Sequence, residues 1–146
     1  MMAGLNKTGD TSLCPSARSN WAESQVFGVV GGTVETPAVI YLKETEPPSE
    51  YLARLSGTEI TPEEVFRIAA PCEENSCQHF DGRNCRLVTR IVDLLPSVAE
   101  DLPPCAIRRS CRWWQQEGRA ACLRCPQVIT DNYHPSELTV GVSIPQ

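Results

Sequence analysis

Cysteine is the residue type in this chain whose number and placement point most directly to chemistry. Eight cysteines occur among 146 residues, and seven of them lie between Cys72 and Cys125. Cysteine thiolates hold zinc ions and iron–sulfur clusters, whereas in oxidising compartments cysteines pair as disulfides. The spacing of the eight residues and the compartment of the protein decide which of these roles is favoured.

The clustered cysteines form two groups along the chain. The later group has the spacing C-x5-C-x10-C-x2-C and supplies four thiolates, enough for one four-coordinate site. Its members are Cys105, Cys111, Cys122 and Cys125. The earlier group has the spacing C-x4-C-x7-C and consists of Cys72, Cys77 and Cys85. This group needs a fourth ligand, which Cys14, His79 or a non-protein group could supply.

The spacing favours an iron–sulfur cluster over zinc. Structural zinc sites usually bring their ligands as two close pairs, and only Cys122 and Cys125 form such a pair here. Iron–sulfur clusters accept more scattered ligands, and a ligand cysteine followed by proline recurs in ferredoxins. Both Cys14-Pro15 and Cys125-Pro126 have this pattern. We therefore expect one or two 4Fe-4S clusters, with all eight cysteines as candidate ligands and zinc as the alternative cofactor.

Positive charge accumulates around the later group. Five arginines and one glutamate lie between Cys105 and Cys125, in a chain whose net charge is −5. One interpretation is that the arginines compensate the negative charge of a cluster, since buried charge is costly unless it is compensated. A second is a solvated helix face, and a third is a docking surface for RNA or an acidic protein. The residues concerned are Arg108, Arg109, Arg112, Arg119, Arg124 and Trp113.

Composition and charge disfavour several classes of protein. The net charge argues against general binding to nucleic acids or acidic membranes, and no apolar run approaches the ~18 residues of a membrane span. No secretory signal is visible, so we expect a cytoplasmic protein, in whose reducing surroundings the alternative of disulfides is rare. With two histidines and no hydrolase-like constellation, acid–base enzyme activity is not expected. The expected partner is a redox or regulatory protein.

The first part of the chain predicts a leader and a hairpin. Residues 1–24 are polar, and we expect a flexible leader there, followed by one metal-binding domain over 25–146 with its cysteine-rich part at 72–126. Two apolar runs, at 26–30 and 38–42, flank a pair of glycines and predict a β-hairpin.

Four helices are expected after the hairpin. Residues 49–55 predict a short one, and Thr61-Pro62 with Glu64 predicts the start of a second, which Pro71 ends. A third should run from Cys85 to about Leu95, where the helix dipole favours the thiolate and predicts a lowered pKa for Cys85. A fourth is expected over 106–117. It should turn Ile107, Cys111 and Trp114 toward the core.

These elements predict a small α+β domain. An N-terminal β-hairpin packs beside three to four short helices, and the cysteine-rich loops converge to hold metal. The predicted function is that of an iron–sulfur protein, for electron transfer or for sensing redox state or oxygen. The alternative is a zinc-stabilised adaptor that binds a protein or RNA partner through its arginine and tryptophan surface.

Overall fold

The computed structural model describes residues 12–32, 37–74, 77–128 and 141, and these form a small α+β structure. A four-stranded antiparallel sheet has the strand order β2-β5-β3-β4. The strands are β2 (Leu13–Cys14), β3 (Gln25–Gly32), β4 (Pro37–Glu46) and β5 (Phe66–Pro71). The α-helices are α1 (Ser49–Leu55), α2 (Pro62–Val65), α3 (Arg86–Leu94), α4 (Arg112–Glu117) and α5 (Arg119–Cys122). Two 3-10 turns, η2 (Arg108–Ser110) and η3 (Cys125–Gln127), complete them.

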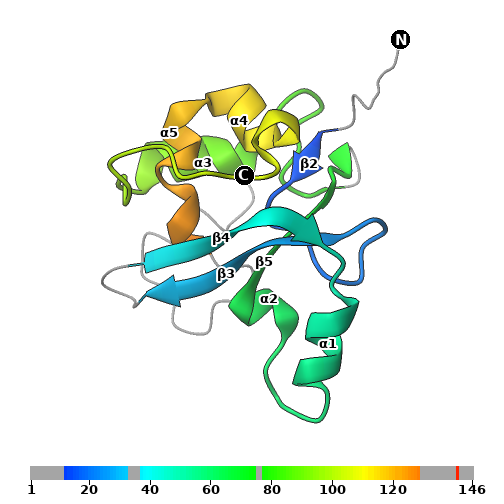
Figure 1. The fold of residues 1–146 in the computed structure, drawn as a ribbon. Helices are drawn as coiled ribbons and strands as arrows, with labels where there is room; N and C mark the ends of the chain where they lie inside the picture. Colours follow the sequence, from blue (N-terminus) through cyan, green and yellow to red (C-terminus); the bar gives the residue numbers. More distant parts are fainter. Residues whose placement is uncertain (1–11, 33–36, 75–76, 129–140, 142–146) are drawn as a thin grey trace.

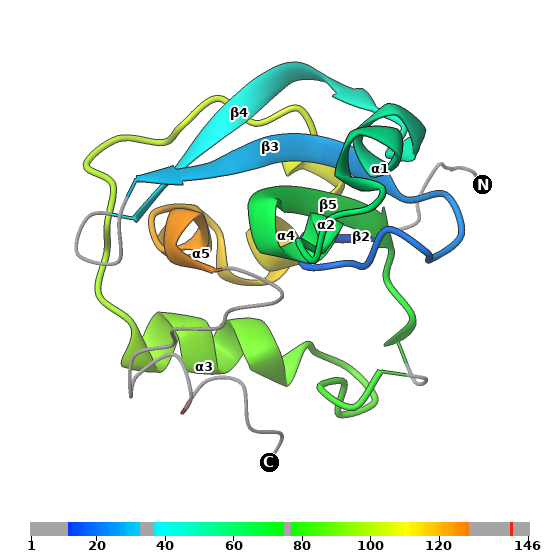
Figure 2. The same ribbon diagram turned by 90° about the horizontal axis from the view of Figure 1, so that it is seen from below.

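The helices cover the sheet unequally. Figure 1 shows α3, α4 and α5 grouped on one side of the sheet, with α1 and α2 on the other. In the view of Figure 2, α4 and α5 lie between the sheet and α3. None of the helices in the described ranges combines the length and the apolar character of a membrane span.

The predicted hairpin is confirmed. Strands β3 and β4 pair antiparallel from Gly32 opposite Pro37 to Gly28 opposite Tyr41, and a bulge separates Val26 from Gly28. Side chains alternate along β3 as the strand period requires. Val26 packs on the side away from α3–α5, and Phe27 packs on the side toward them.

The second predicted helix ends much earlier than expected. Only Pro62–Val65 is helical, with the Glu64 carboxylate accepting a hydrogen bond of 3.2 Å from the Thr61 N–H. From Phe66 the chain continues as β5, which pairs with β3 so that Arg67 lies opposite Gly28. Ladder hydrogen bonds to strands on both sides of β5 outweigh the local helix signal, because propensity is a weak prior beside tertiary pairing.

Part of the expected leader contributes to the sheet. Strand β2 pairs with β5, with Cys14 opposite Ala70. Beyond it Pro15 and Ala17 are buried, and the Ala17 N–H donates to the Ile68 carbonyl at 2.9 Å. Residues 1–11 lie outside the described residues.

The last predicted helix is broken in two. The chain makes the turn η2, leaves helical geometry at Cys111 (ψ 124°) and starts again as α4. Ile107 and Cys111 are buried as predicted, and Trp114 packs partly against the core, but the break shifts the helical phase so that Trp113 is the more deeply buried tryptophan. Trp113 is 2% exposed and packs in the core, while Trp114 is half-buried beneath the Arg108 guanidinium.

The sheet side that faces α3–α5 carries the larger core. Apolar residues from the sheet and from the helices pack together there, and two cysteines are among them. The buried members are Phe27, Ala69, Cys85, Val88, Ile91, Leu95, Ile107, Cys111, Trp113 and Ala121. A smaller cluster of Ala17, Val26, Ile68 and Ala70 packs on the opposite face. The cysteine-rich segments are therefore positioned by the main core.

The close packing of β3 on β4 yields a stability prediction. A Cβ atom at Gly28 would lie 2.6 Å from Val39 Cγ1 and 3.4 Å from the Ile40 carbonyl oxygen. We expect Gly28→Ala to lower the free energy of unfolding by about 1–3 kcal/mol, measured by urea denaturation. Gly31→Ala is the matched control, because its Cβ would meet no atom closer than 3.9 Å. An equal loss in both variants would contradict this account.

Candidate metal centre

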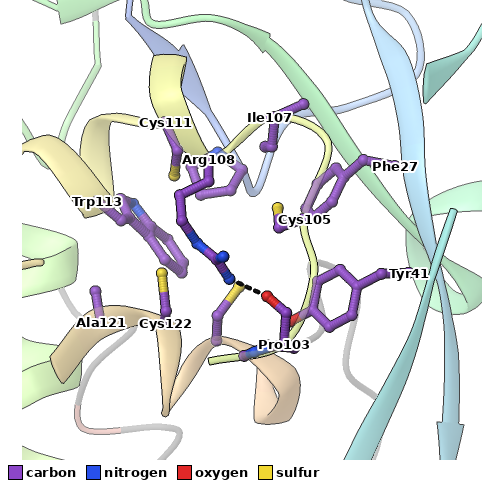
Figure 3. Close-up of a pocket in the computed structure, with 12 residues that line it drawn as sticks. Phe27, Tyr41, Pro103, Cys105, Ile107, Arg108, Cys111, Trp113, Ala121 and Cys122 are labelled. Atoms are coloured by element: carbon purple, nitrogen blue, oxygen red, sulfur yellow. Dashed lines mark hydrogen bonds between the residues drawn. The ribbon is translucent and has the colours of Figure 1, made fainter. Parts of the chain in front are cut away.

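The four cysteines of the later group lie around one hollow between the sheet and α4–α5. The hollow is lined by Cys105, Cys111, Cys122 and Cys125 together with Pro15, Phe27, Tyr41, Pro103, Ile107, Arg108, Trp113 and Ala121. Figure 3 shows the sulfur atoms of Cys105, Cys111 and Cys122 on its wall, with Arg108 extended across it. The structure thus brings together the four residues that the spacing assigned to one site.

Short elements separated by turns place these four thiols. Cys105 precedes η2, and its carbonyl accepts a hydrogen bond of 3.3 Å from the Arg108 N–H. Cys111 is the N-cap of α4, Cys122 is the last residue of α5, and Cys125 begins η3. Because each cysteine stands where an element begins or ends, the chain can turn its side chain inward without carrying it along a continuous helix.

Burial dominates the electrostatics of these thiols. It raises the pKa of Cys111 to about 12, with the Cys125 and Cys105 thiolates adding to the rise. Burial likewise raises the pKa of Cys105 and of Cys122, and again the Cys125 thiolate contributes. Each thiol therefore lies near enough to its neighbours for their charges to oppose its ionisation. Four thiolates can coexist here only if positive charge is supplied.

Arg67 supplies one such charge from the middle of the sheet. Its side chain is fully buried, and its Nη2 atom lies 3.1 Å from Cys125 Sγ. The guanidinium also donates to the Cys125 carbonyl at 2.6 Å and to the Pro15 carbonyl at 2.9 Å. Its partners within the described part of the chain are thus two carbonyls and one thiol. None is a carboxylate.

The surroundings of Arg67 favour its charged form. The guanidinium carbon lies 5.4 Å from the centre of the Phe27 ring and 5.9 Å from that of Trp113, distances typical of cation–π contacts. Burial alone would lower the pKa of Arg67, but the Cys125 thiolate and Tyr41 together raise it above its ordinary value. The sequence did not point to Arg67, because residues 66–70 carry a helix signal there.

Arg108 is a second cation at the hollow. Its guanidinium donates to the Pro103 carbonyl and lies 5.6 Å from the centre of the Trp114 ring. A hydrogen bond from Arg108 acts to lower the pKa of Cys122, against the larger effect of burial. One of the arginines that the sequence singled out thus lines the hollow beside these cysteines.

The other members of the predicted arginine and tryptophan surface differ in their exposure and contacts. Trp113 is buried, which corrects its assignment as a docking residue. Arg119 donates to the Glu100 carbonyl at 3.0 Å, and Arg124 donates to the Leu95 and Ala120 carbonyls at 2.8 Å each. Arg112 forms a salt bridge of 2.9 Å with Glu74. Arg109 is exposed.

The earlier group gains Cys14 as a fourth neighbour. Burial raises the pKa of Cys14 to about 12, and the thiolates of Cys85, Cys72 and Cys77 each add to the rise. Burial also raises the pKa of Cys85, outweighing the backbone N–H groups of Val88 and Leu87 that act to lower it. Our expectation of a lowered pKa at this helix start is therefore wrong, because desolvation exceeds the effect of the exposed amides.

His79 has a different contact. Its Nδ1 atom lies 2.7 Å from Nη2 of Arg90, which can only donate. This contact makes Nδ1 an acceptor and leaves the proton of the neutral ring on Nε2. Burial, followed by the charge of Arg90, lowers the pKa of His79. The Nδ1 atom of His79 is thus already occupied by Arg90.

The cysteines form no disulfide, and all eight are free. Across the described ranges, no group of three or more Cys, His, Asp or Glu side chains has the arrangement that holds a metal ion. No protein-family model, curated protein or solved structure matches the chain.

The raised thiol pKa values predict alkaline destabilisation of the metal-free chain. Cys14 and Cys111 titrate near 12 when folded and near 9.0 ordinarily, so the folded state holds their protons more tightly than the unfolded state. The stabilisation that these two thiols give the folded state is fully present below pH 9.0 and is lost as the pH rises toward about 12. Urea denaturation across this window should show the free energy of unfolding falling, and falling less steeply in Cys111→Ala. Identical slopes in the two proteins would contradict this assignment.

Proposed function

We propose that the chain is an iron–sulfur protein whose cluster is held by Cys105, Cys111, Cys122 and Cys125 and serves in electron transfer. The observation that carries the proposal is the hollow lined by all four thiols, with the buried Arg67 guanidinium on Cys125 Sγ.

Charge balance supports an anionic occupant. A buried guanidinium is costly unless an anion compensates it, and the nearest acidic group to Arg67 is the Cys125 thiol. Four thiolates on a cluster leave the site net negative, and Arg67 and Arg108 offset part of that charge. The same cations would have no clear purpose beside four neutral thiols.

The order of the cysteines along the chain supports a cluster over a single ion. Structural zinc sites usually bring their ligands as two close pairs, and only Cys122 and Cys125 form such a pair here. In a cluster each thiolate binds a different iron atom, so more scattered ligands are accepted.

Several features favour electron transfer over the other roles. Four protein thiolates leave no iron open to bind a small ligand, and aromatic residues Phe27, Tyr41 and Trp113 line the site. The partner on this proposal is a redox protein, and the compartment is the reducing cytoplasm. For the rival role of zinc-stabilised adaptor, the buried Trp113 is not open to a partner, while Arg109 and Arg119 are exposed.

Cluster binding is tested by removing one ligand. In protein prepared without oxygen, Cys125→Ser should lose the iron, the acid-labile sulfide and the visible absorbance that this group contributes. It should also unfold at lower denaturant concentration, because metal-binding energy is partly folding energy. The control is Ser110→Ala, a change at the half-buried residue beside Cys111. This variant should keep its full content of iron and sulfide. Wild-type protein without iron and sulfide would refute the proposal.

The charge of Arg67 predicts a shift in reduction potential. Reduction adds negative charge to a cluster, and a buried cation stabilises the reduced state more than the oxidised one. Arg67→Gln should therefore lower the potential by about 60 mV or more, where 59 mV is a tenfold change in a one-electron equilibrium. Arg67→Lys keeps the charge and should shift the reduction potential less.

Redox titration of the reconstituted proteins measures these shifts. The exposed Arg109→Gln removes the same charge at the surface and should move the potential far less, since solvent screens it. Equal shifts in Arg67→Gln and Arg109→Gln would show that the buried guanidinium does not act on the cluster.

A further inference from the structure

The sheet places Cys14 and Cys72 side by side. Cys14 pairs with Ala70 across the β2–β5 ladder, and the ladder continues with the Cys72 N–H donating to the Ser12 carbonyl at 2.8 Å. Cys14 is the last residue of β2, and Cys72 directly follows β5. The ends of two paired strands therefore bring these two cysteines close together.

A tight loop brings Cys77 and Cys85 together. The Cys77 carbonyl accepts a hydrogen bond of 3.1 Å from the Phe80 N–H, and Phe80 forms a β-bridge with Cys85. The loop closes through the Asp81 carboxylate, which accepts from the N–H groups of Arg83 and Asn84 at 3.0 and 2.8 Å. The chain thus reverses direction between the two cysteines.

Helix α4 joins these two pairs. Arg112 bonds to Glu74 at 2.9 Å, packs 5.4 Å from the centre of the Phe80 ring and hydrogen-bonds the Cys72 thiol. Gln116 fixes Cys85 from the same helix, with its amide oxygen accepting from the Cys85 N–H at 2.8 Å and its amide nitrogen donating to the Cys85 carbonyl at 2.9 Å. One helix therefore holds both halves of the earlier group and presents a cation to it.

We propose that Cys14, Cys72, Cys77 and Cys85 hold a second iron–sulfur cluster, so that the chain carries two. This inference rests on the proposed function, since it assigns the same chemistry to the second group. Cys14 supplies the fourth ligand, which the group of Cys72, Cys77 and Cys85 lacks. The second cluster therefore has four protein thiolates, like the first.

Neighbouring residues connect the two sites. Cys14 belongs to one group, and Pro15, the next residue, lines the hollow of the other. Cys111 lines that hollow, while the adjacent Arg112 contacts Cys72, and Leu13 bridges to Cys111. Consecutive Cα atoms are about 3.8 Å apart, so the clusters lie within easy reach of direct electron exchange. One electron entering from a reduced redox protein can pass from one cluster to the other and leave to a one-electron acceptor protein.

Iron and sulfide counts of matched variants test the second site. Wild-type protein reconstituted without oxygen should bind about eight iron atoms and eight sulfides per chain, four of each per cluster. The double variant Cys14→Ser/Cys72→Ser should keep about four of each. Cys122→Ser/Cys125→Ser, its counterpart in the later group, should also keep about four. The cluster that remains in each variant, together with far-ultraviolet circular dichroism, shows that the chain still folds.

Electron paramagnetic resonance adds a readout that folding alone does not move. Two adjacent reduced clusters couple magnetically, so wild-type protein should give a broadened spectrum and each double variant a simple one. About four irons in the wild type, unchanged in Cys14→Ser/Cys72→Ser, would overturn the second site and leave the proposed function standing. Absence of iron and sulfide from the wild type, or zinc in their place, would overturn both.

Discussion

The Arg67 guanidinium, buried against the Cys125 sulfur at 3.1 Å, is the interaction on which the rest of the site depends. A buried cation requires a neighbouring anion. Buried thiols, in turn, ionise to metal-binding thiolates more easily beside a cation. Arg67 also reaches the Pro15 carbonyl, one residue from Cys14 of the other cysteine group. The same guanidinium therefore ties the central strand β5 to the two segments that carry the thiols.

Short strands and helices position Arg67 and the cysteines around it. Strand β5 directs Arg67 and Ala69 to the side of the sheet that faces α3–α5, while Ile68 and Ala70 pack on the other side. Helix α4 begins at Cys111 and continues with Arg112, so one helix start serves both groups. Breaks between η2, α4, α5 and η3 give the chain many ends at which a cysteine can turn inward. Occupied sites would hold these ends together, which is why cofactor binding and folding should be strongly coupled.

Local patterns predicted the parts of the fold that depend on local energetics. The pairing of β3 with β4, helix α1 and helix α3 follow from strand alternation and helical periodicity, although Gly31 and Gly32 lie within the ladder and not in the turn. Cysteine spacing alone also identified the later group as one site. These features need only neighbours in the sequence.

The remaining features depend on contacts between distant segments. Residues 66–70 carry a helix signal, yet pairing with β2 and β3 makes them a strand. The sequence therefore did not predict that Arg67 contacts the cysteines. The break at Cys111 placed Trp113 in the core, deeper than the partly buried Trp114 that was expected there. Cys14 joins its group only through the β2–β5 ladder, and Cys85 loses the predicted pKa shift because of burial. In each case tertiary structure outweighed a local preference.

X-ray absorption at the iron edge, on protein reconstituted without oxygen, tests the central claim most directly. If the thiols hold clusters, every iron atom should have a shell of sulfur atoms at about 2.3 Å, the usual metal–thiolate distance, and a second shell of neighbouring iron atoms. Iron bound by nitrogen or oxygen, or iron without another iron nearby, would contradict the account.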